Sequence, residues 1–331
     1  MATQPSHAWQ VLYPPLQAHD HGWLDVGDGH ELYWETAGNP LGLPALFVHG
    51  GPGAGCTADD RRWFDPRRYR IVLFDQRGCS RSRPPGRLAA NDTAHLVADI
   101  ESLRRHLRVG RWLLFGGSWG ATLALAYAQR HPARVHALVL RGVFTATQRE
   151  RQWLYGASGA AALEPAAWRR LVAAVPGAGQ TDLLRVIAAR LHCGDRAGQA
   201  AAANAWLQWE QDLMDSEAPE DHPGDAQPVH DASCALAMAR IGVHFARQAF
   251  FLGEAQLLHN AARLRAVPGV IVHGARDRVA PPAAAQALHA AWPGSRLCIV
   301  EQAGHASSHP GMAQQLVAAT DFFGTGQGDP A

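Results

Sequence analysis

The chain has 331 residues, of which 47% are hydrophobic, enough for the core of one large α/β domain that carries an insertion. The formal net charge of +1, without a basic or acidic tail, argues against binding to nucleic acid or to an anionic membrane. Five cysteines without a C-x-x-C pair argue against a disulfide framework and a structural zinc site, so we expect no metal and no cofactor.

Targeting and membrane segments are not expected either. Residues 1–10 have neither the cationic nor the apolar region of a signal peptide. No apolar run approaches the roughly 18 residues that span a bilayer. The sequence therefore predicts a soluble, cytoplasmic protein with no membrane partner, and it carries no signal for an oligomeric state.

Strand-like and helix-like segments alternate through the first half of the chain. Residues 23–37 alternate around a Gly-Asp-Gly turn, which predicts an antiparallel hairpin. The segments that follow are strands at 45–48 and 70–74, a helix at 92–108, a strand at 112–115, a helix at 121–129 and a strand at 137–140. This alternation predicts a mostly parallel sheet with helices on both faces.

The pattern changes between residues 146 and 250, where Ala, Trp and Arg dominate and no buried strand is evident. We interpret 146–250 as a helical cap, with a polar loop at 216–230, inserted into a core formed by 1–145 and 251–331. The core pattern then resumes with strands at 267–273 and 296–300, a helix at 283–291 between them, and a last helix at 312–323.

The run G-G-S-W-G at 116–120 lies between a predicted strand and a predicted helix, the setting of a nucleophile elbow. A serine on such a sharp turn projects its Oγ out of the sheet, and the flanking glycines keep side chains out of the turn. The helix that starts there directs backbone N–H groups toward developing negative charge. Ser118 is therefore the candidate nucleophile. The alternative is a glycine-rich turn that only connects two elements.

A nucleophilic serine needs a histidine base and an acid that orients it. Behind an elbow, the acid and then the histidine follow at the ends of later strands. Asp277 comes after the strand at 267–273, and His305 follows the strand at 296–300, so we predict Asp277 as the acid and His305 as the base. His309, before Pro310 at the start of the next helix, is the nearest competitor; His273 lies within a strand and is expected to be structural.

An oxyanion hole is the third requirement. It combines the N–H of the residue after the nucleophile, here Trp119, with an N–H from an early strand-to-helix loop. The run H-G-G-P-G at 49–53 is that loop, and its glycines let the backbone approach a substrate closely. We predict Gly51 as the second donor, with Gly50 as the alternative.

Four segments together resemble one family: H-G-G-P-G at 49–53, D-Q-R-G-C-S-R-S at 75–82, G-G-S-W-G-A-T-L-A-L at 116–125 and A-G-H at 303–305. The chain resembles the proline iminopeptidases, serine peptidases of the α/β-hydrolase fold that release N-terminal proline. The resemblance is strong over residues 20–150 and fair over 260–325. It implies an α/β-hydrolase core with an inserted helical cap.

The resemblance also implies a substrate site in the cap. The family binds the free amino terminus with a pair of glutamates, and W-L-Q-W-E at 206–210 matches its W-x-x-W-E, which makes Glu210 one candidate. The second glutamate falls in an I-E-N-H-Y-F-like stretch, where this chain has Gly242. The resemblance offers Phe144 and Tyr155 as equivalents of the aromatics that hold the proline ring. The alternative for Glu210 is a solvated helical glutamate, and the alternative for Phe144 and Tyr155 is a place in the core.

These readings predict a cofactor-independent serine hydrolase that releases N-terminal proline, or a small apolar residue, from short peptides or amides. Because Gly242 removes one carboxylate, an esterase or amidase acting on an uncharged acyl group is the alternative. A catalytically inactive relative that only binds a ligand is a third reading, which the complete set of Ser118, Asp277 and His305 disfavours.

Overall fold

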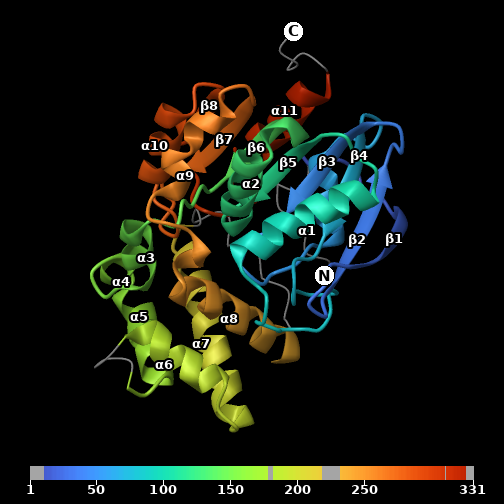
Figure 1. Cartoon of the computed structure of the whole chain (residues 1–331). Helices are drawn as coiled ribbons and strands as arrows, with labels where there is room; N and C mark the ends of the chain where they lie inside the picture. The colour runs from blue at the N-terminus through green and yellow to red at the C-terminus, as the bar shows by residue number, and fades with distance from the viewer. Residues whose placement is uncertain (1–10, 178–181, 218–231, 310, 326–331) are drawn as a thin grey trace, which may run out of the picture.

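The computed structural model describes residues 11–177, 182–217, 232–309 and 311–325. An eight-stranded sheet runs through it in the order β1-β2-β4-β3-β5-β6-β7-β8 (Figure 1). The strands are β1 (Ala18–Asp25), β2 (Glu31–Gly38), β3 (Leu43–Val48), β4 (Tyr69–Phe74), β5 (Trp112–Gly117), β6 (Val135–Arg141), β7 (Gly269–Gly274) and β8 (Ser295–Val300). β2 is antiparallel to both of its neighbours, and all pairings from β4 to β8 are parallel. The predicted hairpin and the mostly parallel sheet are confirmed.

Helices cover both faces of the sheet, which is why central strands such as β5 are buried along their whole length. One face packs against α1 (Thr93–His106), α2 (Trp119–Arg130) and α10 (Ala283–Ala291), and the other against α11 (Met312–Gly324) and the 3-10 helix η2 (Ala58–Trp63). Short helices complete this part: η3 (Pro132–Arg134), η4 (Ala249–Phe251), α9 (Gln256–His259) and η5 (Ala261–Leu264).

All elements between β6 and η4 that the structure describes are helices. They are α3 (Gln148–Tyr155), α4 (Ala160–Leu163), α5 (Pro165–Ala174), α6 (Leu183–Leu191), α7 (Arg196–Asp215) and α8 (Ala232–Arg247). In Figure 1 they gather together below the sheet, away from α11. The helical character predicted for 146–250 is confirmed; its division from the core as a cap stays a prediction. Most of the loop predicted at 216–230, like residues 1–10, lies outside the described residues.

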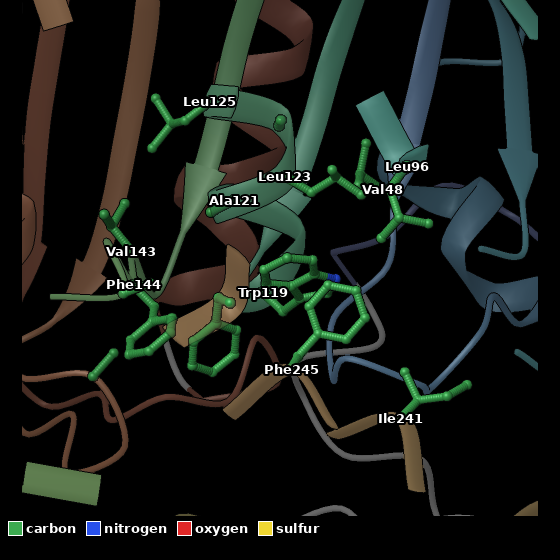
Figure 2. Close-up of a cluster of buried hydrophobic side chains, with 14 of the residues drawn as sticks. Val48, Leu96, Trp119, Ala121, Leu123, Leu125, Val143, Phe144, Ile241 and Phe245 are labelled. Atoms are coloured by element: carbon green, nitrogen blue, oxygen red, sulfur yellow. The ribbon is translucent and has the colours of Figure 1, made fainter. Parts of the chain in front are cut away.

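Aromatic packing joins this helical segment to the elbow helix. Figure 2 shows Trp119, at the start of α2, beside Phe245 of α8, with Phe144 and Ile241 in the same apolar cluster. The ring centroids of Trp119 and Phe245 are 4.9 Å apart, and both side chains are fully buried. Burial of two large aromatic side chains at one contact is a strong packing interaction. It holds α8 against the turn that carries Ser118.

Local geometry shifts one of two predicted helix starts. The helix after the elbow begins at Trp119 rather than at Ala121, because the helical backbone starts directly after Ser118. The last helix begins at Met312, and the preceding His309 lies in a turn, where its Nδ1 accepts a 2.8 Å hydrogen bond from the Gly304 N–H. Among the described residues, no helix is both long and apolar enough to cross a membrane.

Candidate active site

Ser118 lies on a strained turn between β5 and α2. Its backbone adopts φ 57° and ψ −125°, a conformation that L-residues with side chains rarely adopt and that active-site turns often hold. Glycine is required two residues before and two residues after Ser118. A Cβ on Gly116 would come within 2.4 Å of the Gly120 carbonyl oxygen, and one on Gly120 would come within 2.0 Å of the Val48 carbonyl oxygen. The sequence motif therefore has the turn geometry that was predicted for it.

Asp277 and His305 lie in the loops that follow β7 and β8, and their side chains contact each other. The Nδ1 of His305 lies 2.8 Å from Oδ2 of Asp277, and both side chains are buried. The other carboxylate oxygen of Asp277 accepts a 2.7 Å hydrogen bond from the Ala280 N–H. Because Nδ1 contacts Asp277, Nε2 is the ring nitrogen left to act as a general base, and His305 lines the cavity beside Ser118.

Burial and charge act on this pair in opposite directions. Burial lowers the pKa of His305, and the attraction of Asp277 only partly offsets it, so the imidazole is favoured in its neutral form. Burial acts to raise the pKa of Asp277, but His305 and His273 together hold it below its ordinary value. His273 has the structural position predicted for it, since its ring lies between the Val143 N–H and the Ala280 carbonyl.

The loop at 49–53 is tied to the elbow by Gln76. The side-chain amide of Gln76 donates to the His49 carbonyl at 2.9 Å, and its Oε1 accepts a hydrogen bond of 2.9 Å from the Trp119 indole. Gly51 has φ +110°, which favours glycine, and precedes a cis peptide bond to Pro52. Gly50 and Gly51 both line the same cavity as Trp119, so the structure leaves both predicted donors beside the nucleophile.

A cavity of about 270 Å³ joins these elements. It is lined by residues of the elbow, the 49–53 loop, the helical segment and the histidine loop. Among them are Ser118, Trp119, Gly50, Gly51, Phe144, Tyr155, Glu210, Met238, Arg141 and His305. All predicted site residues except Asp277 therefore line one cavity, and Asp277 lies behind His305.

Glu210, predicted to bind an amine, reaches the cavity from α7. Burial raises the pKa of this carboxyl to about 7, and a hydrogen bond from the Tyr155 hydroxyl, at 3.5 Å, opposes the rise. The Tyr155 ring stacks on Trp206 with centroids 4.9 Å apart. Gly242 lies nearby on α8: a Cβ there would be 3.2 Å from the Trp206 indole nitrogen. Glu210 is thus an interior carboxyl without a second acid at position 242.

Two charged residues beside the cavity and the histidine loop, Glu217 and Arg141, were not among the site residues predicted from the sequence. Glu217, just after α7, is buried and accepts backbone hydrogen bonds from His305 (2.5 Å), Val279 (3.2 Å) and Arg278. Arg141, at the end of β6, donates to the His305 carbonyl at 2.8 Å and lines the cavity. Local sequence carries no signal for Glu217, whereas Arg141 at the carboxyl end of a central strand could have been flagged by its position.

The arrangement of His, Cys, Asp and Glu side chains bears on metal binding. In the part of the chain that the structure describes, no group of three or more His, Cys, Asp or Glu side chains is arranged to hold a metal ion. The residues around the cavity instead include the hydroxyl of Ser118, the imidazole of His305, backbone amides and the carboxyls of Glu210 and Asp215. This set suits acyl transfer to a serine.

Comparison with known proteins agrees with this fold. A model of the alpha/beta hydrolase fold family matches residues 44–311. Among solved structures, a hydrolase from Pseudomonas aeruginosa covers 94% of this chain with a TM-score of 0.62 at 22% identity. A proline iminopeptidase-related protein from Thermus thermophilus covers 91% with a TM-score of 0.58, also at 22% identity. The sheet, the elbow and this match define an α/β hydrolase.

Sequence relatives narrow the assignment. A proline iminopeptidase of Xylella fastidiosa is 48% identical over 315 residues, which cover 95% of this chain and 99% of the relative. A proline iminopeptidase of Arabidopsis thaliana is 44% identical over 314 residues, or 94% of this chain and 82% of the relative. The chain belongs to the proline iminopeptidase family. The predictions of fold, hydrolase class and family are confirmed.

Proposed function

We propose that this chain releases N-terminal proline, or a small apolar residue, from short peptides or amides through an acyl-enzyme on Ser118. The observation that carries the proposal is the convergence of Ser118, His305 and Glu210 on one cavity of about 270 Å³. A nucleophile, its base and an interior carboxyl in one small space suit a substrate with a scissile carbonyl and a nearby amine. The setting is the cytoplasm, and neither nucleic acid nor membrane is part of the proposal.

In this mechanism His305 takes the proton from the Ser118 hydroxyl as its oxygen attacks the carbonyl carbon of the N-terminal residue. The N–H groups of Trp119 and Gly51 stabilise the oxyanion, a role in which one donor is worth roughly 10²–10³ in rate. His305 then gives the proton to the leaving amine, and the acyl-enzyme forms. Water, deprotonated by His305, releases the free amino acid. Asp277 keeps the imidazole in the right tautomer throughout.

Recognition of the amino terminus falls to Glu210. An ammonium in a low-dielectric cavity needs compensating charge. Two acids line the cavity, Glu210 and Asp215; Asp215 is exposed, whereas Glu210 is more buried and contacts Tyr155. The rings of Phe144 and Tyr155 border the same cavity and supply apolar surface for a pyrrolidine ring. Glu210 is therefore the carboxylate that we assign to selection of an unblocked amine.

The test compares turnover of prolyl, alanyl and N-acetyl-prolyl nitroanilides and of nitrophenyl acetate, with Ser118→Ala as the blank. We expect cleavage of the prolyl anilide, abolished by N-acetylation and by Ser118→Ala. Ester turnover without prolyl anilide cleavage would instead favour the esterase or amidase alternative that Gly242 suggests. An intact fold with no labelling of Ser118 by a fluorophosphonate would indicate an inactive relative.

A further inference from the structure

The guanidinium of Arg141 is an interior cation without a carboxylate partner. It donates to the His305 carbonyl at 2.8 Å, and among the described residues no carboxylate lies within ion-pair distance of it. Asp277, Glu217 and Asp60 attract it only from farther away. Burial lowers the pKa of Arg141, the direction expected for a cation taken out of water. Arg141 is half-buried and is one of the residues that line the cavity.

The position of this cation relative to Ser118 follows from the sheet. Arg141 pairs with Gly117 across β5 and β6, and its carbonyl accepts a 2.9 Å hydrogen bond from the Ser118 N–H. A Cβ on Gly117 would fall within 2.4 Å of the Arg141 guanidinium, so the charged group packs directly against the backbone before the nucleophile. The guanidinium therefore contacts Gly117, the residue directly before Ser118.

Arg141 lies beside the histidine loop. His305 must deliver its proton to the leaving amine, so the leaving residue lies beside the histidine loop. Arg141 holds the carbonyl of that same His305. Glu210 and Tyr155, in contrast, come from the helical segment. The carboxyl of Glu210 and the guanidinium of Arg141 therefore border the same cavity from different elements, and the guanidinium lies beside the histidine loop.

We propose that Arg141 binds the free C-terminal carboxylate of the leaving residue, which makes dipeptides with an N-terminal proline the preferred substrate class. This inference rests on the proposed function and names its substrate. The amine and the carboxylate of a dipeptide are at most about 7 Å apart, because each residue spans roughly 3.5 Å. A cavity of about 270 Å³ holds a ligand of this size. The planar fork of arginine matches a carboxylate in bidentate fashion.

The experiment measures kcat/KM for prolyl-glycine and for prolyl-glycinamide, following free proline by mass spectrometry. The two substrates differ only in the charge of the leaving residue. In the wild-type enzyme we expect the free acid to be preferred by roughly ten-fold or more, the worth of one charge-assisted hydrogen bond pair. Arg141→Gln should bring the ratio close to one, and Arg141→Lys should keep part of the preference.

Arg276→Gln is the matched control. It removes the same charge from an exposed residue beside the acid loop that does not line the cavity, so the preference should persist. Equal turnover of the two peptides by the wild-type enzyme overturns the assignment of Arg141 and leaves the proposed function intact. A preference that survives Arg141→Gln overturns it as well. Failure to release proline from either peptide overturns the proposed function, and this inference with it.

Discussion

The carboxyl of Glu217 accepts a 2.5 Å hydrogen bond from the backbone N–H of His305. Its other oxygen accepts the N–H groups of Arg278 and Val279, directly after Asp277. One side chain at the end of α7 therefore connects the acid loop, the histidine loop and the helical segment. Burial and the charge of Asp277 raise the pKa of Glu217 to about 8. Its function in the structure is to position the two loops.

Removal of this side chain should lower both activity and stability. In Glu217→Ala, one buried and two partly buried N–H groups lose their acceptor, at a cost on the order of 1–3 kcal/mol for a buried group that stays unsatisfied. We expect a lower melting temperature and a kcat reduced more than KM is changed, with partial recovery in Glu217→Gln. Glu164→Ala is the control, because Glu164 contacts only the Arg278 side chain in this region. An unchanged kcat in Glu217→Ala would remove the positioning role.

Gly142 should be essential for the placement of the imidazole. Its φ is +54°, and a Cβ there would lie 2.9 Å from Cε1 of His305. Gly142→Ala should displace the ring from Asp277 and lower kcat by roughly 10²-fold or more, the scale at which misplacement of a reacting group by about 1 Å acts. Gly110→Ala, at a glycine with nothing within 4 Å of the added methyl, should leave kcat unchanged. Steady-state kinetics on prolyl nitroanilide provides the measurement.

The acid limb of the pH profile should depend on the substrate. Glu210 has a pKa of about 7, so the carboxylate that pairs with an ammonium is lost as the pH falls through that value. The pKa of His305 is below its usual range, so the neutral base persists to lower pH. The kcat/KM of a prolyl anilide should therefore fall below about pH 7, whereas that of nitrophenyl acetate should fall only at lower pH.

The control for this profile is Glu210→Gln, which should weaken prolyl anilide turnover and leave the ester profile as it is. Coincident acid limbs for the two substrates in the wild-type enzyme would mean that Glu210 does not bind the amine.

A second carboxylate should strengthen amine binding. Gly242 is four residues after Met238 on α8, so the two lie on the same helix face, and Met238 lines the cavity. Gly242→Glu should lower the KM of prolyl anilide, by roughly ten-fold if the new carboxylate pairs with the ammonium. Gly242→Gln has a similar shape without the charge and should not. Equal KM values in the two variants would show that position 242 does not reach the amine.

The core elements were predictable because each leaves a local pattern. The apolar run before G-G-S-W-G and the small residues after it indicate a strand, a turn and a helix within about 20 residues. Asp277 and His305 were found because parallel strands deliver the residues that follow them to one edge of the sheet. The helical character of 146–250 followed from composition in the same way.

In the helical segment, the local sequence pattern does not predict which acidic side chains are buried. Glu217 and Asp212 lie close in sequence, yet Asp212 pairs with Arg170 near the surface while Glu217 is buried against the histidine loop. Arg141 is an ordinary strand-end residue until the sheet sets it beside Gly117. The sequence by itself determined which residues are candidate reacting groups and their order along the chain, because these follow from backbone periodicity and turn chemistry. Only the tertiary structure decided which charges face the cavity and what burial does to their pKa values, because desolvation and Coulomb attraction depend on neighbours distant in sequence.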